Sequence, residues 1–182
     1  MPAWAAADRY PFLFHLGLPS HDARVVSPAS SRSMRVLLAD DHQPFRTSLR
    51  TLLSSVEGVD VVSEVGDGDA AVAVAASCLI DVVVLDLHLP GIGGADAIRR
   101  IGALGAPPAV IVLSMDDRPE TRALAHRAGA FGFVAKGSDP EILVDLLHAG
   151  FRDSQARRDA RPMTCGTLAS DHDSDSADDH KD

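Results

Sequence analysis

The sequence predicts a doubly wound α/β fold, in which helices cover both faces of a five-stranded parallel sheet. Short apolar runs alternate five times with segments of helical periodicity between Met34 and Phe151. The connections between them are short and are marked by Gly, Pro and Asp. Hydrophobic residues make up 46% of the 182-residue chain, which is enough for the core of one domain of ordinary size.

Five short apolar runs are the predicted strands. The third run has four consecutive branched apolar residues, a pattern typical of a strand that is buried on both faces of a parallel sheet. The second run carries polar residues, which predicts a position nearer an edge of the sheet. In chain order, the predicted strands are Val36–Ala39, Val59–Val65, Val82–Leu85, Val110–Leu113 and Phe131–Ala135.

A helix is predicted after each strand. Pro44 suits the first turn of the first helix, and Asp67 can cap the second. Ser138 and Glu141 have the spacing of a capping box that opens the last helix. The expected helices span about 44–56, 67–78, 95–104, 120–128 and 139–151. Right-handed crossovers place them on both faces of the sheet.

Both ends of the chain lack periodic patterns. Residues 1–33 are predicted to be a disordered leader, residues 34–151 the folded domain and residues 152–182 a disordered acidic tail. Met34 begins a strand, so translation starting there is an alternative. The last twelve residues hold six Asp and one Lys, which supplies five of the nine net negative charges. The net charge of −9 argues against general binding to nucleic acid or to an anionic membrane.

The sequence favours a cytoplasmic protein. No apolar run approaches the ~20 residues of a membrane span, and residues 1–33 lack the pattern of a secretory signal. Cys78 and Cys165 are too few for a disulfide framework and have no metal-ligand spacing. Cys78 is expected to be a small core residue.

Four of the five predicted strands end in charged or hydroxyl side chains. These residues are Asp40 and Asp41, Asp86, Ser114 and Lys136. Each alone has an ordinary explanation as a cap, a turn residue or a solvent-facing charge. Because the carboxyl ends of parallel strands lie at one edge of a sheet, together they predict a shared site.

The three carboxylates would repel one another unless a cation neutralised them. Oxygen ligands without His or Cys favour a hard ion, and Mg²⁺ is the usual choice. A carboxylate beside Mg²⁺, a lysine and a hydroxyl is suited to accepting a phosphoryl group, giving an aspartyl phosphate. No general base for fast hydrolysis is evident. The adduct is therefore expected to act as a lasting signal, and the protein is not expected to be an enzyme.

These strand-end residues, with Leu89-Pro90, resemble the receiver domain of bacterial two-component response regulators. The resemblance covers about residues 34–151 and implies the flavodoxin-like receiver fold. It implies that Asp86 is phosphorylated, with a histidine kinase or a phosphotransfer protein as the donor. It also implies that Asp41, Asp86 and the backbone carbonyl of His88 bind Mg²⁺ directly, while Asp40 helps through water.

The resemblance implies further roles at the other strand ends. Ser114 and Lys136 would bind the phosphoryl group, and Ser114 and Phe133 would form a switch. Phe133 replaces the more usual tyrosine and has no ring hydroxyl. His88 and Asp116 occupy positions that tune dephosphorylation in the family.

The segments 113–117 and 127–133 resemble the NarL/FixJ-type subgroup, whose members carry a helix-turn-helix DNA-binding domain after the receiver. Residues after Phe151 are too few and too polar to fold one. We therefore expect a stand-alone receiver, or one whose gene has lost the output domain. It would signal through an unknown partner protein without direct DNA binding, and phosphorylation could produce a homodimer.

Two other functions are compatible with parts of the pattern. One is a degenerate or truncated receiver that acts as a binding module without being phosphorylated. The other is a phosphohydrolase with an aspartate nucleophile, of the haloacid-dehalogenase-like type. Such enzymes carry a second Asp two residues after the nucleophile, and here that position is His88.

Overall fold

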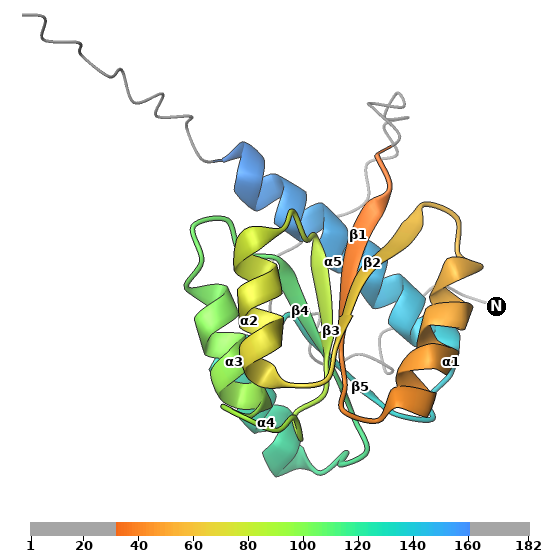
Figure 1. The fold of residues 1–182 in the computed structure, drawn as a ribbon, viewed down its shortest axis with the longest axis vertical. Coiled ribbons are helices and arrows are strands. Elements are labelled where there is room, and N and C mark those ends of the chain that lie inside the picture. The colour runs from red at the N-terminus through yellow and green to blue at the C-terminus, as the bar shows by residue number, and fades with distance from the viewer. Residues whose placement is uncertain (1–31, 161–182) are drawn as a thin grey trace, which may run out of the picture. The chain divides into compact units, whose positions relative to one another are not determined.

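The structure is a computed structural model that describes residues 32–160. Five parallel strands form one sheet in the order β2-β1-β3-β4-β5 (Figure 1). The strands are β1 (Met34–Ala39), β2 (Val59–Val65), β3 (Val82–Leu85), β4 (Ala109–Ser114) and β5 (Gly132–Ala135). The helices are α1 (Gln43–Ser54), α2 (Gly68–Ser77), α3 (Gly94–Gly102), α4 (Pro119–Ala128) and α5 (Pro140–Asp159). The predicted fold class is confirmed.

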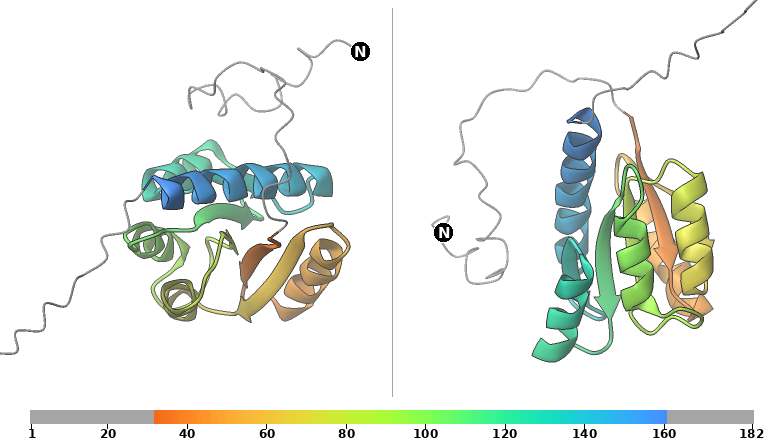
Figure 2. Two further views of the ribbon diagram at one scale, coloured as in Figure 1. Left: turned by 90° about the horizontal axis from the view of Figure 1, so that it is seen from above. Right: turned by 90° about the vertical axis from the view of Figure 1, so that its left-hand side faces the viewer.

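Two hydrophobic cores lie on opposite faces of the sheet, because successive side chains of a strand point to opposite sides. In β1, Leu37 and Ala39 contribute to the core under α2, α3 and α4. Val36 and Leu38 contribute to the core under α1 and α5. The two further views show this division, with α5 on one side of the sheet and α2 and α3 on the other (Figure 2).

The strand burial follows the predicted pattern. All four residues of β3 are buried, as expected for a strand with helices on both faces. β2 lies at one edge of the sheet, where its Asp60 is exposed. The prediction that the polar second strand lies near an edge is confirmed.

The N-cap of α2 agrees with the prediction, and the N-cap of α5 does not. Asp67 caps α2 by accepting a 2.7 Å hydrogen bond from the amide of Ala70. The predicted capping box of α5 is wrong, because Asp139 is the N-cap residue and accepts a 3.0 Å hydrogen bond from the amide of Glu141. Ser138 instead donates its backbone amide to the carbonyl of Ala135, which closes the preceding turn.

α5 continues eight residues beyond Phe151, where the folded pattern was predicted to stop. Its last turn is held by Arg158, which donates hydrogen bonds to Asp81 and to the carbonyl of Ile80. Residues 152–159 are therefore helical and not part of a disordered tail. The predictions for residues 1–31 and 161–182 lie outside the described residues.

Asp81 joins three segments at the amino-terminal end of the sheet. Its carboxylate is completely buried. Oδ1 accepts hydrogen bonds from Arg32 at 2.5 Å and from Arg158, and Oδ2 accepts one from the amide of Arg35 at 2.9 Å. A buried carboxylate needs such partners. Arg32 lies before β1 and Arg158 at the end of α5, so Asp81 links the entry and the exit of the domain.

Cys78 is exposed, and its predicted core position is wrong. It lies just after α2 and has an extended backbone, which places it outside the packed face of the helix. Cys165 lies outside the described residues.

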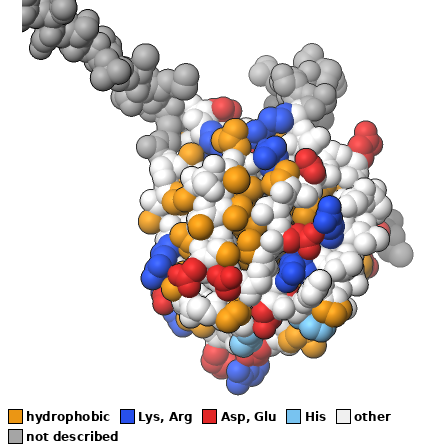
Figure 3. All heavy atoms as spheres, in the orientation of Figure 1, with side chains coloured by type: hydrophobic (Ala, Val, Ile, Leu, Met, Phe, Trp, Pro, Cys, Tyr) orange, Lys and Arg blue, Asp and Glu red, His pale blue; other side chains and the backbone are white. Residues whose placement is uncertain are grey.

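α2 is apolar around much of its circumference. Its Ala73 and Ala76 are exposed, as is Leu79 just after it. Hydrophobic side chains accordingly gather on the face of the molecule that carries α2 (Figure 3). Within residues 32–160, no helix has both the length and the apolar character needed to cross a bilayer.

Candidate functional site

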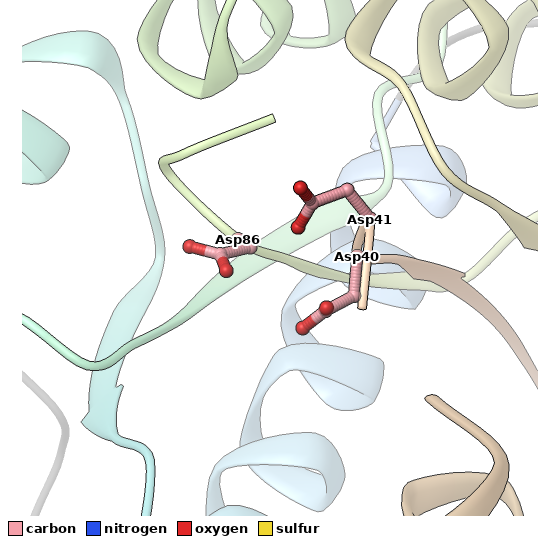
Figure 4. A group of neighbouring side chains, drawn as sticks. All are labelled: Asp40, Asp41 and Asp86. Atoms are coloured by element: carbon pink, nitrogen blue, oxygen red, sulfur yellow. The ribbon is translucent and has the colours of Figure 1, made fainter. Parts of the chain in front are cut away.

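Asp40 and Asp86 directly follow the neighbouring strands β1 and β3, which end at the same level of the sheet. Ala39 and Leu85 are paired in register, and the amide of Asp86 donates a 2.9 Å hydrogen bond to the carbonyl of Ala39. Asp41 follows directly and is exposed, whereas Asp40 and Asp86 are buried. One oxygen of each of the three carboxylates lies within 4.8 Å of the others (Figure 4).

The chain just after each buried aspartate orients its carboxylate. Oδ1 of Asp40 accepts a 2.9 Å hydrogen bond from the amide of His42. Oδ1 of Asp86 accepts a 3.0 Å bond from the amide of His88 in the same way. The imidazole of His88 is exposed, with Nδ1 3.6 Å from Asp86 Oδ1. The predicted role of the His88 carbonyl in metal binding stays a prediction.

Lys136 bridges the two buried carboxylates. The amide of Lys136 donates a 2.8 Å hydrogen bond to the carbonyl of Ser114, which fixes where its side chain begins. Its Nζ lies 2.6 Å from Asp40 Oδ2 and 2.5 Å from Asp86 Oδ2. The ammonium also lies 4.6 Å from the centre of the Phe45 ring, a distance at which a cation is attracted by the aromatic face.

Burial by itself would lower the pKa of Lys136, since the side chain is only 7% exposed. The hydrogen bonds from Lys136 to Asp40 and Asp86, with the charges of these two carboxylates, outweigh burial and raise the pKa above its ordinary value. The lysine therefore stays protonated throughout the neutral range and places a fixed positive charge beside Asp86.

Ser114 ends β4 and is completely buried. Its Oγ accepts a 3.2 Å hydrogen bond from the amide of Asp116, so the hydroxyl is tied to its own following loop. Oδ2 of Asp116 accepts hydrogen bonds from Arg118 at 2.6 Å and from Thr121 at 2.7 Å. The hydrogen bonds from Arg118 and Thr121 lower the pKa of the Asp116 carboxyl far below its ordinary value.

Phe133 lies on β5, where it pairs with Val112 of β4. The ring is half-buried and packs against the core under α2, α3 and α4. The guanidinium carbon of Arg122 lies 4.5 Å from the centre of the ring. The predicted switch residues therefore lie on adjacent strands. Phe133 contacts Arg122 of α4, and Ser114 contacts Asp116 in the loop before α4.

Gly94 lets α3 approach the backbone that follows Asp86. A Cβ at this position would lie 2.5 Å from the Cα of Leu87 and 2.6 Å from the carbonyl oxygen of Asp86. Both atoms belong to the backbone, so they cannot be relieved by a change of rotamer. Nothing in the sequence marked Gly94 as different from the other glycines of its loop.

We expect Gly94→Ala to lower the free energy of unfolding by about 1–3 kcal/mol, because overpacking forces the backbone to shift. The displaced segment includes Asp86, so Mg²⁺ should also bind more weakly. Urea unfolding and the thermal shift on Mg²⁺ addition measure the two effects. Gly102→Ala on the same helix is the control, since its Cβ would meet nothing within 4 Å. Equal behaviour of the two variants would contradict this account.

The donor set fits a magnesium ion. Three carboxylates supply oxygen ligands only, which hard divalent cations prefer. With all three ionised, the single positive charge of Lys136 leaves two negative charges in the cluster. Of the three carboxylates, Asp41 is the exposed one, which leaves a side from which hydrated ions can approach.

Residues 36–148 match the response regulator receiver domain family. This match spans more than half of the chain and includes every residue of the site. The chain belongs to the response regulator receiver family. As predicted, the site residues of the matched range lie at the carboxyl ends of the strands: Asp40, Asp41, Asp86, Ser114 and Lys136.

The receiver is similar to several curated regulators. It is 36% identical to the nitrate/nitrite response regulator protein NarP of Escherichia coli over 121 residues, which cover 66% of this chain and 56% of NarP. It is 34% identical to the response regulator UvrY of Escherichia coli over 116 residues, covering 64% of this chain and 53% of UvrY. The chain thus spans about half the length of the curated relatives it matches.

Solved structures give the same result. The signal receiver domain of the putative response regulator NarL from Mycobacterium tuberculosis is 31% identical, with a TM-score of 0.61, over 68% of this chain and 98% of that one. A LuxR-family two-component response regulator from Aurantimonas is 30% identical, also with a TM-score of 0.61, over 71% and 99%. The resemblance to the NarL-type subgroup is confirmed.

The structure brings four of the predicted residues of this receiver into direct proximity: Asp40, Asp41, Asp86 and Lys136. Ser114 contacts Lys136 through the backbone, and Phe133 lies on the neighbouring strand. Sequence reasoning missed Phe45, Gly94 and Arg122. Phe45 packs against the core under α1 and α5 with other apolar residues of α1, and its position over the Lys136 ammonium distinguishes it from them.

Proposed function

We propose that this receiver accepts a phosphoryl group on Asp86 from the phosphohistidine of a histidine kinase or a phosphotransfer protein. One observation carries the proposal. The Asp86 carboxylate is 6% exposed at the end of a buried strand, with the ammonium of Lys136 2.5 Å away and two more carboxylates beside it. Carboxylates placed in this way serve as nucleophiles in phosphoryl transfer.

In the proposed step, a carboxylate oxygen of Asp86 forms a bond to phosphorus while the phosphorus–nitrogen bond of the donor breaks. The histidine of the donor leaves as imidazole and recovers a proton from water. The amide of His88 holds the other oxygen of Asp86, which keeps the carboxylate in one orientation. Lys136 offers its ammonium to the incoming phosphoryl oxygens.

Asp40, Asp41 and Asp86 would hold Mg²⁺, with the carbonyl of His88 as a further ligand. When bound, the ion neutralises negative charge on the phosphoryl oxygens. The Lys136 ammonium, which lies 2.6 Å from Asp40 Oδ2 and 2.5 Å from Asp86 Oδ2, would then turn from Asp40 toward a phosphoryl oxygen on Asp86.

Ser114 and Phe133 would report phosphorylation to the surface. The Ser114 hydroxyl would leave the amide of Asp116 and bind a phosphoryl oxygen, which moves the loop after β4. Phe133 would move inward with it and remodel the face formed by α4, β5 and α5. A local change of charge can bias a two-state element in this way. A partner protein would bind this face, and a second copy of the chain is another candidate to bind it.

We propose that the chain is a phosphorylated substrate of the kinase and not an enzyme that turns over phosphate. The half-life of the adduct, measured after removal of the donor, tests this assignment. A cytoplasmic location, with access to kinase and Mg²⁺, is part of the same proposal.

The test is incubation of the full chain with Mg²⁺ and acetyl phosphate, followed by intact-mass analysis and a phosphate-affinity gel. We expect one phosphoryl group on the wild type and none on Asp86→Asn, and no adduct when Mg²⁺ is chelated. Asp145→Asn, which removes an exposed carboxylate of α5, is the control and should be phosphorylated normally. An unmodified wild type, or an equal adduct on Asp86→Asn, would refute the proposal.

A further inference from the structure

Arg122 of α4 joins the loop that follows β4 to the ring of Phe133. Its Nε donates a 2.5 Å hydrogen bond to Oδ1 of Asp117, and its Nη2 pairs with the same oxygen. Its guanidinium carbon lies 4.5 Å from the centre of the Phe133 ring, whose face attracts a cation. One side chain therefore contacts the loop and the ring at the same time.

The same loop also holds Ser114. The amide of Asp116 donates to the Ser114 hydroxyl at 3.2 Å, and Asp116 is in turn bound by Arg118 and Thr121. Asp117, the partner of Arg122, is the next residue. Residues 115–118, which we call the switch loop, are thus tied to Ser114 at one end and to Phe133 through Arg122.

α4 provides a fixed base for this connection. Its Ala125 and Ala128 are buried against the sheet, whereas the Arg122 side chain lies on the partly exposed face. The planar guanidinium can stack on the ring and donate to Asp117 at once, which a lysine ammonium cannot do with the same geometry. Movement of Phe133 away from α4 breaks the stacking, and movement of the switch loop breaks the ion pair.

We propose that Arg122 is a positioning residue that holds Phe133 and the switch loop in the arrangement seen here and thereby opposes the switch. The inference rests on the proposed function, because it concerns how readily Ser114 and Phe133 respond to a group on Asp86. A ligand that favours the other arrangement must break the Arg122 contacts. By linkage, loss of those contacts strengthens binding of that ligand.

The phosphoryl mimic beryllofluoride is a suitable probe, since it has been used with a related regulator, RcsB of Salmonella enterica serovar Typhimurium. We expect Arg122→Gln to bind beryllofluoride about three- to tenfold more tightly than the wild type in saturating Mg²⁺, the range expected for loss of one stacked and ion-paired contact. Asp117→Asn should shift the affinity in the same direction. Fluorine NMR titration of the full chain measures the dissociation constants.

Three controls separate positioning from a structural role. Arg127→Gln removes an exposed arginine from the same helix and should leave the affinity unchanged. Arg122→Lys keeps the charge and should restore only part of the wild-type constant. In a Phe133→Leu background, Arg122→Gln should have little further effect, because the ring that it holds is gone. Urea unfolding shows that each variant is folded.

The outcomes are distinct. Tighter binding in Arg122→Gln that disappears in the Phe133→Leu background supports the inference. An unchanged constant, or the same tightening with and without the ring, overturns it while leaving the proposed function intact. A wild-type chain that takes up neither beryllofluoride nor a phosphoryl group overturns the proposed function and this inference together.

Discussion

Replacing Lys136 with methionine should slow phosphorylation of Asp86 by about 100-fold or more, the usual cost of removing one charge-stabilising donor from a reacting centre. The ammonium is the cation nearest to Asp86 Oδ2 among the described residues, at 2.5 Å, and it is almost completely buried. Methionine keeps a side chain of similar length but cannot stabilise charge on the phosphoryl oxygens. The initial rate of adduct formation with acetyl phosphate measures the effect.

The other lysine of the sequence provides a matched control. Lys181→Met makes the same chemical change outside the described residues and should not alter the rate. Mg²⁺ affinity should rise in Lys136→Met, because the cluster loses its own cation while the three carboxylates remain. A variant that is phosphorylated within a few-fold of the wild-type rate would show that Lys136 does not stabilise the reacting group.

Asp81→Ala should lower the free energy of unfolding by about 3–5 kcal/mol, because removing one partner of a buried ion pair leaves the others uncompensated. The substitution leaves Arg158 and the amide of Arg35 without their acceptor at the amino-terminal end of the sheet. Urea unfolding followed by circular dichroism measures the loss. Asp60→Ala, which removes an exposed carboxylate of β2, should change stability little.

Two further variants identify the cause. Arg158→Met removes the partner on α5, and the double variant with Asp81→Ala should lose less stability than the sum of the single losses. Hydrogen exchange should accelerate at residues 152–159 in either variant, since this ion pair holds the last turns of α5. Phosphorylation of folded protein should persist, because Asp81 and Asp86 lie at opposite ends of β3. Additive losses would show that the two side chains act separately.

The alternation of apolar runs and helical segments predicted nearly all of the fold. The five strands are found within one or two residues of their predicted bounds, because their apolar side chains pack into the cores on the two faces of the sheet. The N-cap of the last helix was predicted incorrectly. Ser138 and Asp139 are both good capping residues, and only the backbone geometry of the turn after β5 selects Asp139.

The end of the domain was misplaced for a different reason. Apolar periodicity fades after Phe151, although Asp153 and Arg157 have the i,i+4 spacing of a helical ion pair and lie 2.5 Å apart. Residues 152–159 are stabilised by Arg158, which binds a carboxylate 77 residues earlier in the sequence. A contact of that separation leaves no signal in a local pattern.

The sequence by itself determined which residues form the acidic site. Polar residues that end parallel strands must share one edge, which predicted a common site for Asp40, Asp41, Asp86 and Lys136. The strand order, with β1 beside β3, brings them into contact. Tertiary structure alone decided what surrounds and controls that edge. Phe45 lies over Lys136, Gly94 lies against the backbone of Asp86, and Arg122 lies over Phe133. These contacts join separate elements, and side-chain periodicity carries no information about distances between elements.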